Sequence, residues 1–96
     1  MNNQGTINVI RNKSYVGMLI EFDVYVDNQF VGVIKNGTNV CVPVYLGNHM
    51  VSIKSPDKQV DQPVVLQPGQ QNIFIECKCK MGLITGRPNI TNIYFR

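Results

Sequence analysis

Three cysteines and one histidine are the residues best suited to hold a metal ion or act as nucleophiles: Cys41, His49, Cys77 and Cys79. A tetrahedral zinc site uses four such ligands, commonly with Cys-x₂₋₄-Cys spacings. The Cys-x-Cys spacing found here instead places Cys77 and Cys79 on one strand face, following Ile73 and Ile75. Because free cysteine is among the most buried residue types, the pattern predicts core packing and no metal. A small metal protein or enzyme built on these four residues is the least favoured alternative.

His49 and the acidic residues give no recognisable catalytic motif. His49 follows a turn and begins a strand, and no neighbouring serine or cysteine forms a nucleophile motif with it. Glu21, Asp23 and Asp27 fall on one face of an alternating segment and lack the spacing of a calcium loop, so we expect them to face solvent. The sequence therefore predicts a protein that is not an enzyme, with no catalytic, metal or cofactor-binding residues.

Four tyrosines could form a stacking surface for sugars or bases: Tyr15, Tyr25, Tyr45 and Tyr94. A shallow groove lined by two of them would favour binding of carbohydrate or another cell-envelope component. Spacing alone does not say which of them are neighbours.

Charge and hydropathy bound the partners and the location. Nine basic and six acidic residues give a net charge of +3, and the basic ones are scattered, so we expect a solvated surface and no nucleic-acid site. No apolar run approaches the roughly 20 residues that cross a bilayer, and no signal peptide is recognisable. We expect a soluble monomer without direct membrane insertion, cytoplasmic by default, or else the soluble part of a membrane-anchored protein. The odd cysteine count fits a reducing compartment.

Residues 20–54 organise the predicted fold as four short strands joined by three tight turns. Ile20, Phe22, Val24 and Val26 alternate with polar residues, which is typical of a half-buried strand. The turns are expected at Asp27-Asn28, at Asn36-Gly37 and at Leu46-Gly47-Asn48. Asn36-Gly37 predicts a type I′ hairpin, since both central residues of that turn need positive φ. Pro43 predicts an edge strand, because proline cannot donate to a ladder.

The remaining segments complete a predicted domain of strands and loops. Alternation predicts strands at 6–11, 60–67 and 71–80, the last of them central, and Gln67-Pro68-Gly69-Gln70 predicts a type II turn. We expect residues 1–4 to be frayed, 12–17 and 81–89 to be loops, and 90–96 to be a last strand or a tail. No helical period is present. Residues 1–96 thus predict one all-β domain, a small antiparallel β-sandwich of about seven or eight strands, immunoglobulin-like or transthyretin-like, with no helix.

Two segments resemble a known family. The pattern VYVDNQFVGVIKNG, followed by LGNHMVSIK, is similar to the "VYVDG-x-x-VG" and "PGxHxVxVK" motifs of PEGA-type small bacterial β-sandwich domains and their uncharacterised relatives. The resemblance covers about residues 20 to 80. Asn28 stands where glycine is usual, and Leu46-Gly47-Asn48 replaces Pro-Gly-Lys or Pro-Gly-Glu. The resemblance implies a non-enzymatic accessory module, often carried by envelope-associated or membrane-tethered bacterial proteins. We therefore expect a binding or protein-interaction module whose partner is another protein or an envelope component.

Overall fold

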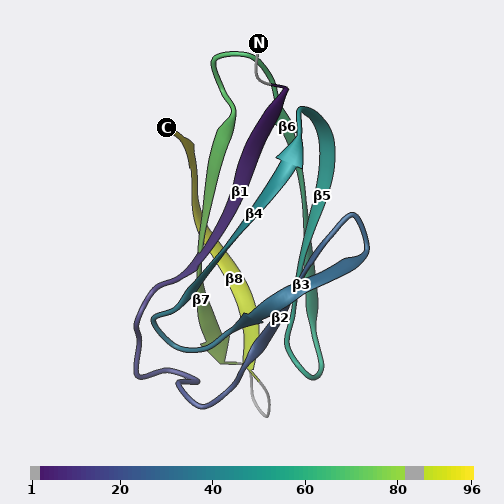
Figure 1. Cartoon of the computed structure of the whole chain (residues 1–96). Helices are drawn as coiled ribbons and strands as arrows, with labels where there is room; N and C mark the ends of the chain where they lie inside the picture. The colour runs from purple at the N-terminus through teal and green to yellow at the C-terminus, as the bar shows by residue number, and fades with distance from the viewer. Residues whose placement is uncertain (1–2, 82–85) are drawn as a thin grey trace.

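The computed structural model describes residues 3–81 and 86–96. Its regular structure is eight β-strands in two four-stranded sheets (Figure 1), and no helix occurs in the described ranges. The strands are β1 (Gln4–Arg11), β2 (Phe22–Val26), β3 (Gln29–Ile34), β4 (Asn39–Tyr45), β5 (Gly47–Lys54), β6 (Gln59–Leu66), β7 (Asn72–Met81) and β8 (Gly86–Phe95). This confirms the all-β, sandwich-like expectation.

The two sheets have the orders β4-β1-β7-β8 and β3-β2-β5-β6. Every pairing between strands is antiparallel except that of β1 with β7, which is parallel. The expectation of a purely antiparallel sandwich is therefore wrong at this one pair. A parallel pair needs a long connection, and here residues 12–71 lie between the two strands.

Strand alternation builds one apolar core between the sheets. Every second residue along the strands points inward, and the buried apolar side chains form a single cluster that both sheets supply. Within it Ile73, Ile75, Cys77 and Cys79 occupy the inner face of β7, as predicted. Strand β7 lies between β1 and β8, which confirms that it is a central strand.

One of the three expected turns in residues 20–54 closes a hairpin. Asp27 and Asn28 have φ of 51° and 66°, and they join the paired strands β2 and β3. Two positive φ values are the signature of a type I′ turn. Here asparagine takes a left-handed position that it tolerates better than most non-glycine residues.

The type I′ hairpin predicted at Asn36-Gly37 is wrong. Gly37 has φ of 76°, but Asn36 is not among the residues with positive φ, and the Lys35 carbonyl accepts a 3.0 Å bond from the Thr38 amide. The turn carries the chain from β3 in one sheet to β4 in the other. The reason is that β3 and β4 face each other across the core with their apolar sides, instead of pairing side by side in one sheet.

The turn at Leu46-Gly47-Asn48 likewise crosses between the sheets. It leads from β4 to β5, which belong to different sheets, and Gly47 has φ of 124°, a conformation that favours glycine. The expected row of four neighbouring strands is therefore divided between two sheets. One sheet receives β2, β3 and β5 and the other receives only β4, and the remaining strands complete both layers.

Prolines and turn residues otherwise fall where the sequence places them. Pro43 lies on the edge strand β4, as predicted, and Pro63 lies on the edge strand β6. The Gln70 amide donates to the Gln67 carbonyl at 2.8 Å and Gly69 has φ of 87°, which confirms the type II turn.

The predictions for the N-terminus and for residues 81–89 are wrong in part. Gln4 belongs to β1, and the Asn3 carbonyl accepts a 2.9 Å bond from the Leu46 amide, so these two residues are not frayed. Residues 1–2 lie outside the described ranges. The predicted loop at 81–89 is wrong for Met81, which ends β7, and for 86–89, which begin β8. Pro88 was taken to indicate a loop, but β8 is an edge strand, and proline is tolerated on an edge strand. Residues 82–85 are not described. The last strand expected at 90–96 is confirmed to Phe95.

Candidate interaction surface

The structure does not bring the cysteines and the histidine together. Cys77 and Cys79 are buried on β7, Cys41 is exposed on β4, and His49 lies on β5 of the other sheet. Within residues 3–81 and 86–96, no group of three or more histidine, cysteine or acidic side chains could hold a metal ion. Burial raises the pKa of the Cys77 thiol to about 11, although the charge of Arg11 opposes the shift. This thiol is therefore protonated and unreactive at neutral pH.

His49 instead forms a bonded pair with Asp27. Its Nδ1 lies 2.6 Å from Oδ2 of Asp27, and its Nε2 lies 2.6 Å from the carbonyl oxygen of Tyr45. The second carboxylate oxygen of Asp27 accepts a 2.9 Å bond from the Met50 amide. Asp27 is exposed to solvent, as expected from alternation, but both oxygens of its carboxylate are bonded to β5. It closes the β2–β3 turn against β5.

The geometry of this pair calls for a protonated imidazole. A carbonyl oxygen and a carboxylate oxygen can only accept, so both ring nitrogens of His49 must donate. Burial alone would lower the pKa of His49, but the bonds to Asp27 and Tyr45 and the negative charge of Asp27 together raise it above 6.5. The bonds from His49 and the Met50 amide lower the pKa of Asp27 below 3.8. The pair is a structural clamp between two turns.

The tyrosines do not gather into one surface. Tyr15, Tyr25 and Tyr45 border three separate pockets. Tyr94 stacks on Phe74 with ring centroids 5.3 Å apart and planes 6° from parallel. Two rings stacked in this way cover one face of each other, which leaves less flat aromatic surface for a sugar.

Sequence reasoning missed the burial of Arg11, which was taken for part of a solvated surface. Its exposed fraction is 1%, and its guanidinium lies 4.1 Å from the centroid of the Phe22 ring. Burial lowers its pKa, and the nearby Cys79 and Cys77 counteract that shift. The signal was present in the sequence, because Arg11 shares strand parity with the inward-facing Ile7 and Val9.

Arg11 fixes the loop that follows β1, residues 12–21, which we call the apolar loop. The guanidinium donates to the carbonyl oxygens of Gly17 at 2.9 Å and Ile34 at 3.1 Å, and also to that of Ile20. The Ile20 amide donates to the Gly17 carbonyl at 3.0 Å, which closes a turn within the loop. A charged donor bonded to three carbonyls thus ties the loop to the end of β3.

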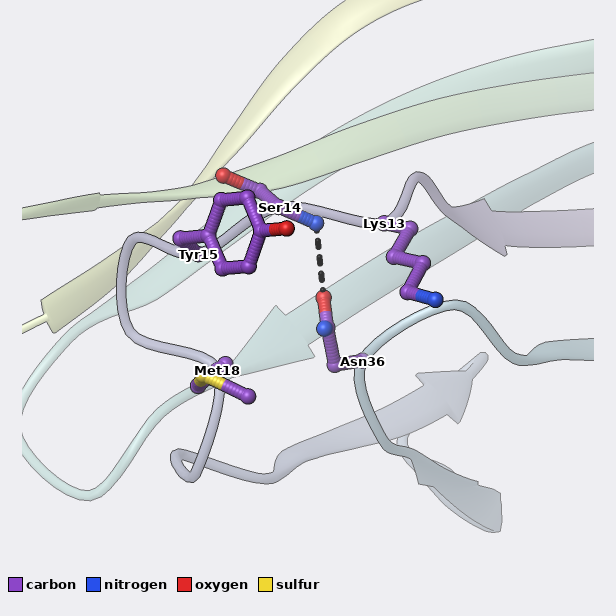
Figure 2. A pocket seen from close by; sticks show the side chains of 5 residues that line it. All are labelled: Lys13, Ser14, Tyr15, Met18 and Asn36. Carbon is purple, nitrogen blue, oxygen red and sulfur yellow. Dashed lines mark hydrogen bonds between the residues drawn. The ribbon is translucent and has the colours of Figure 1, made fainter.

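Two further features hold the apolar loop in place. The Ser14 amide donates to Oδ1 of Asn36 at 2.9 Å, so the loop is joined to the neighbouring turn (Figure 2). Gly17 has φ of 63°, and a Cβ there would lie 2.2 Å from Sγ of Cys79. Only glycine fits this position, both for its backbone conformation and for its contact with the core.

The apolar loop exposes large apolar side chains while its backbone is held. Tyr15 is 90% exposed and Leu19 is 89% exposed, and Val16 and Met18 are also exposed. Tyr15 and Met18 border a cleft of about 320 Å³ that Lys13, Ser14 and Asn36 complete (Figure 2). An ordered segment that presents unburied apolar side chains is the arrangement of a recognition loop.

Comparisons with protein-family models, with curated proteins and with solved structures found no match to this chain. Over the described ranges, no helix has the length and apolar character needed to span a membrane.

Proposed function

We propose that this protein is a non-catalytic binding module and that the apolar loop is its contact surface. The observation that carries the proposal is that Arg11 holds the loop from beneath while Tyr15 and Leu19 stand almost fully in solvent. A contact loop that is already ordered loses little conformational entropy when it binds. Covering these exposed apolar side chains with a partner removes them from water and so stabilises the complex.

The resemblance to PEGA-type domains supports the same proposal. Asp27 and His49 each occupy a motif position in one of the two similar segments, and they bond to each other. The shared residues thus serve the fold, which suits an accessory module whose relatives would differ in their loops. We propose that the chain is a relative of these bacterial domains, with a sandwich of immunoglobulin-like or transthyretin-like type. Two facing sheets around one core support that assignment.

The alternative, a module that binds carbohydrate or another envelope component through tyrosines, has less support. Tyr15, Tyr25 and Tyr45 border different pockets, and the Tyr94 ring is stacked on Phe74. Glycan binding that survives loss of Tyr15 and disappears with Tyr94→Ala would favour this alternative over the apolar loop.

Site-specific photo-crosslinking in living cells tests the proposal. A photoreactive amino acid replaces Tyr15 or Leu19 in turn, and Val65, an exposed apolar residue on β6, is the matched control position. We expect a defined crosslinked product, to a protein or to lipid, from both loop positions, and none from position 65. Crosslinks of equal yield from all three positions, or none from the loop, would overturn the proposal.

A further inference from the structure

The charged side chains of this protein are unevenly distributed along its length. The apolar loop lies at one end of an elongated molecule, at the lower end in Figure 1, with the turns at 35–38 and 55–58. Seven basic and three acidic side chains lie in these loops, in the adjoining strand ends or where β7 ends and β8 begins: Arg11, Lys13, Lys35, Lys54, Lys58, Lys80 and Arg87 against Glu21, Asp23 and Asp57. The rest of the chain holds two basic and three acidic side chains, so the net charge is +4 at this end and −1 over the remainder.

The exposed apolar side chains lie within this basic surround. Lys13 borders the same cleft as Tyr15 and Met18, and Lys54 borders the pocket that Leu19 lines, together with Glu21 and Asp23. Lys35 lies 3.9 Å from Glu21 in an exposed ion pair, which neutralises one of the nearby acids. Exposed apolar side chains and lysines at the same end of the molecule match the chemistry of a bilayer surface, which has an apolar interior beneath anionic headgroups.

We propose that the apolar loop docks this protein onto the surface of an anionic lipid bilayer, with Leu19 and Met18 entering the acyl boundary. This rests on the proposed function and names the partner. Tyr15 suits the headgroup level, where its ring is buried and its hydroxyl stays wet. Lys13, Lys54 and Lys58 contact the anionic headgroups. A projecting loop suits a fluid partner, whereas a stable protein interface needs a broad surface of about 800 Å² on each side.

Vesicle co-sedimentation with the whole chain tests the inference. We expect binding to phosphatidylcholine vesicles that contain about 30% phosphatidylglycerol, and little binding to phosphatidylcholine alone. Raising the salt to about 0.5 M should reduce binding severalfold, because the lysine contribution is screened. The double variant Tyr15→Ser, Leu19→Ser should bind at least about tenfold more weakly, because two apolar side chains are no longer transferred from water to the bilayer.

A control variant and a lysine variant complete this test. Met50→Ser with Val65→Ser removes exposed apolar side chains elsewhere, on β5 and β6, and should bind like the original chain. Lys13→Gln with Lys58→Gln should bind severalfold more weakly and respond less to salt. Matching circular dichroism spectra and melting temperatures show that all variants are folded.

Three results would overturn the inference: no sedimentation with anionic vesicles, unchanged binding of the loop variant, or equal loss in the Met50 and Val65 control. Crosslinks from the photoreactive positions 15 and 19 to a protein, without vesicle binding, would uphold the proposed binding module while rejecting the lipid partner. Absence of both crosslinks and vesicle binding would reject the two together.

Discussion

Nδ1 of His49 lies 2.6 Å from Oδ2 of Asp27, so a residue of β5 and a residue of the β2–β3 turn share one proton-dependent contact. Nε2 of the same ring is bonded to the Tyr45 carbonyl, which precedes β5. The clamp therefore connects the hairpin to the crossing between the sheets. Because His49 is the single histidine of the chain, its titration can be measured without interference from another imidazole.

The stability of the protein should depend on pH through this pair. The pKa of His49 is raised by folding, so its contribution is complete below about 6.5 and is lost as the pH rises through the folded-state value. The pKa of Asp27 is lowered, so its contribution is present above 3.8 and is lost as the pH falls through its folded-state value. We expect greatest stability between these limits.

Denaturant melts of the original chain and of His49→Gln measure this effect. Asp27 is half exposed, so the pair should stabilise by only about 0.5 to 1 kcal/mol. The original chain should lose stability as the pH rises from about 6 through the folded-state pKa of His49, and this loss should disappear in His49→Gln. An identical loss in both proteins would contradict the assignment of a charged clamp.

The left-handed turn residues give a second prediction. Asn28 has φ of 66°, so Asn28→Val should cost about 1 to 3 kcal/mol, whereas Asn28→Gly should leave stability unchanged or raise it. Gly37 has φ of 76°, so Gly37→Val should also cost roughly 1 kcal/mol or more, although its turn is not type I′. Thermal melts check all three. Equal melting temperatures for Asn28→Val and Asn28→Gly would contradict the left-handed conformation of residue 28.

The central strand β7 gives a third prediction. Ile75 is fully buried and Lys78 is exposed, so Ile75→Ala should cost about 2 to 5 kcal/mol and Lys78→Ala well under about 1 kcal/mol. Hydrogen exchange should find the amides of 73–77 among the slowest in the protein, since β7 is bonded on both sides. Rapid exchange at Ile75, or equal costs for the two substitutions, would contradict this position of β7.

Much of this fold could be predicted because strand parity and turn residues are local signals. Ile73 to Cys79 alternate in the sequence as they do in β7, and Pro43 marks an edge. Which strands pair is not a local property. Asn36-Gly37 suits a hairpin and a crossing between sheets equally well, and only the meeting of apolar faces across the core decides between them.

The apolar loop, which we propose as the contact surface, was harder to predict than the fold. Leu19 and Tyr15 are apolar side chains without a strand period, and sequence alone does not distinguish an exposed apolar loop from a buried one. The support of that loop is also non-local, because Arg11 bonds to the carbonyls of Gly17 in the loop and of Ile34 at the end of β3. The one local signal that Arg11 points inward was its alternation with Ile7 and Val9 along β1.

Arg11 gives a fourth prediction. A lysine carries one compact charge and cannot bond to three carbonyls as the planar guanidinium does, so Arg11→Lys should leave buried acceptors unpaired. We expect a cost of about 2 to 4 kcal/mol, with faster hydrogen exchange in residues 12–21 and little change in β6. Arg87→Lys, at an exposed position, is the matched control and should be nearly neutral. Unchanged exchange in the apolar loop would show that Arg11 does not hold it.

The thiols give the last prediction. Cys41 is exposed, whereas Cys77 is buried with its pKa raised to about 11, so one thiol of the native protein should react quickly with Ellman's reagent. Cys41→Ser should abolish that fast phase, and the buried thiols should react only when the protein unfolds, at a rate that follows global stability. EDTA should leave the melting temperature unchanged, because we assign the cysteines to core packing and not to a metal. A second fast thiol in the native protein, or a melting temperature lowered by EDTA, would show that β7 does not hold Cys77 and Cys79 as simple core residues.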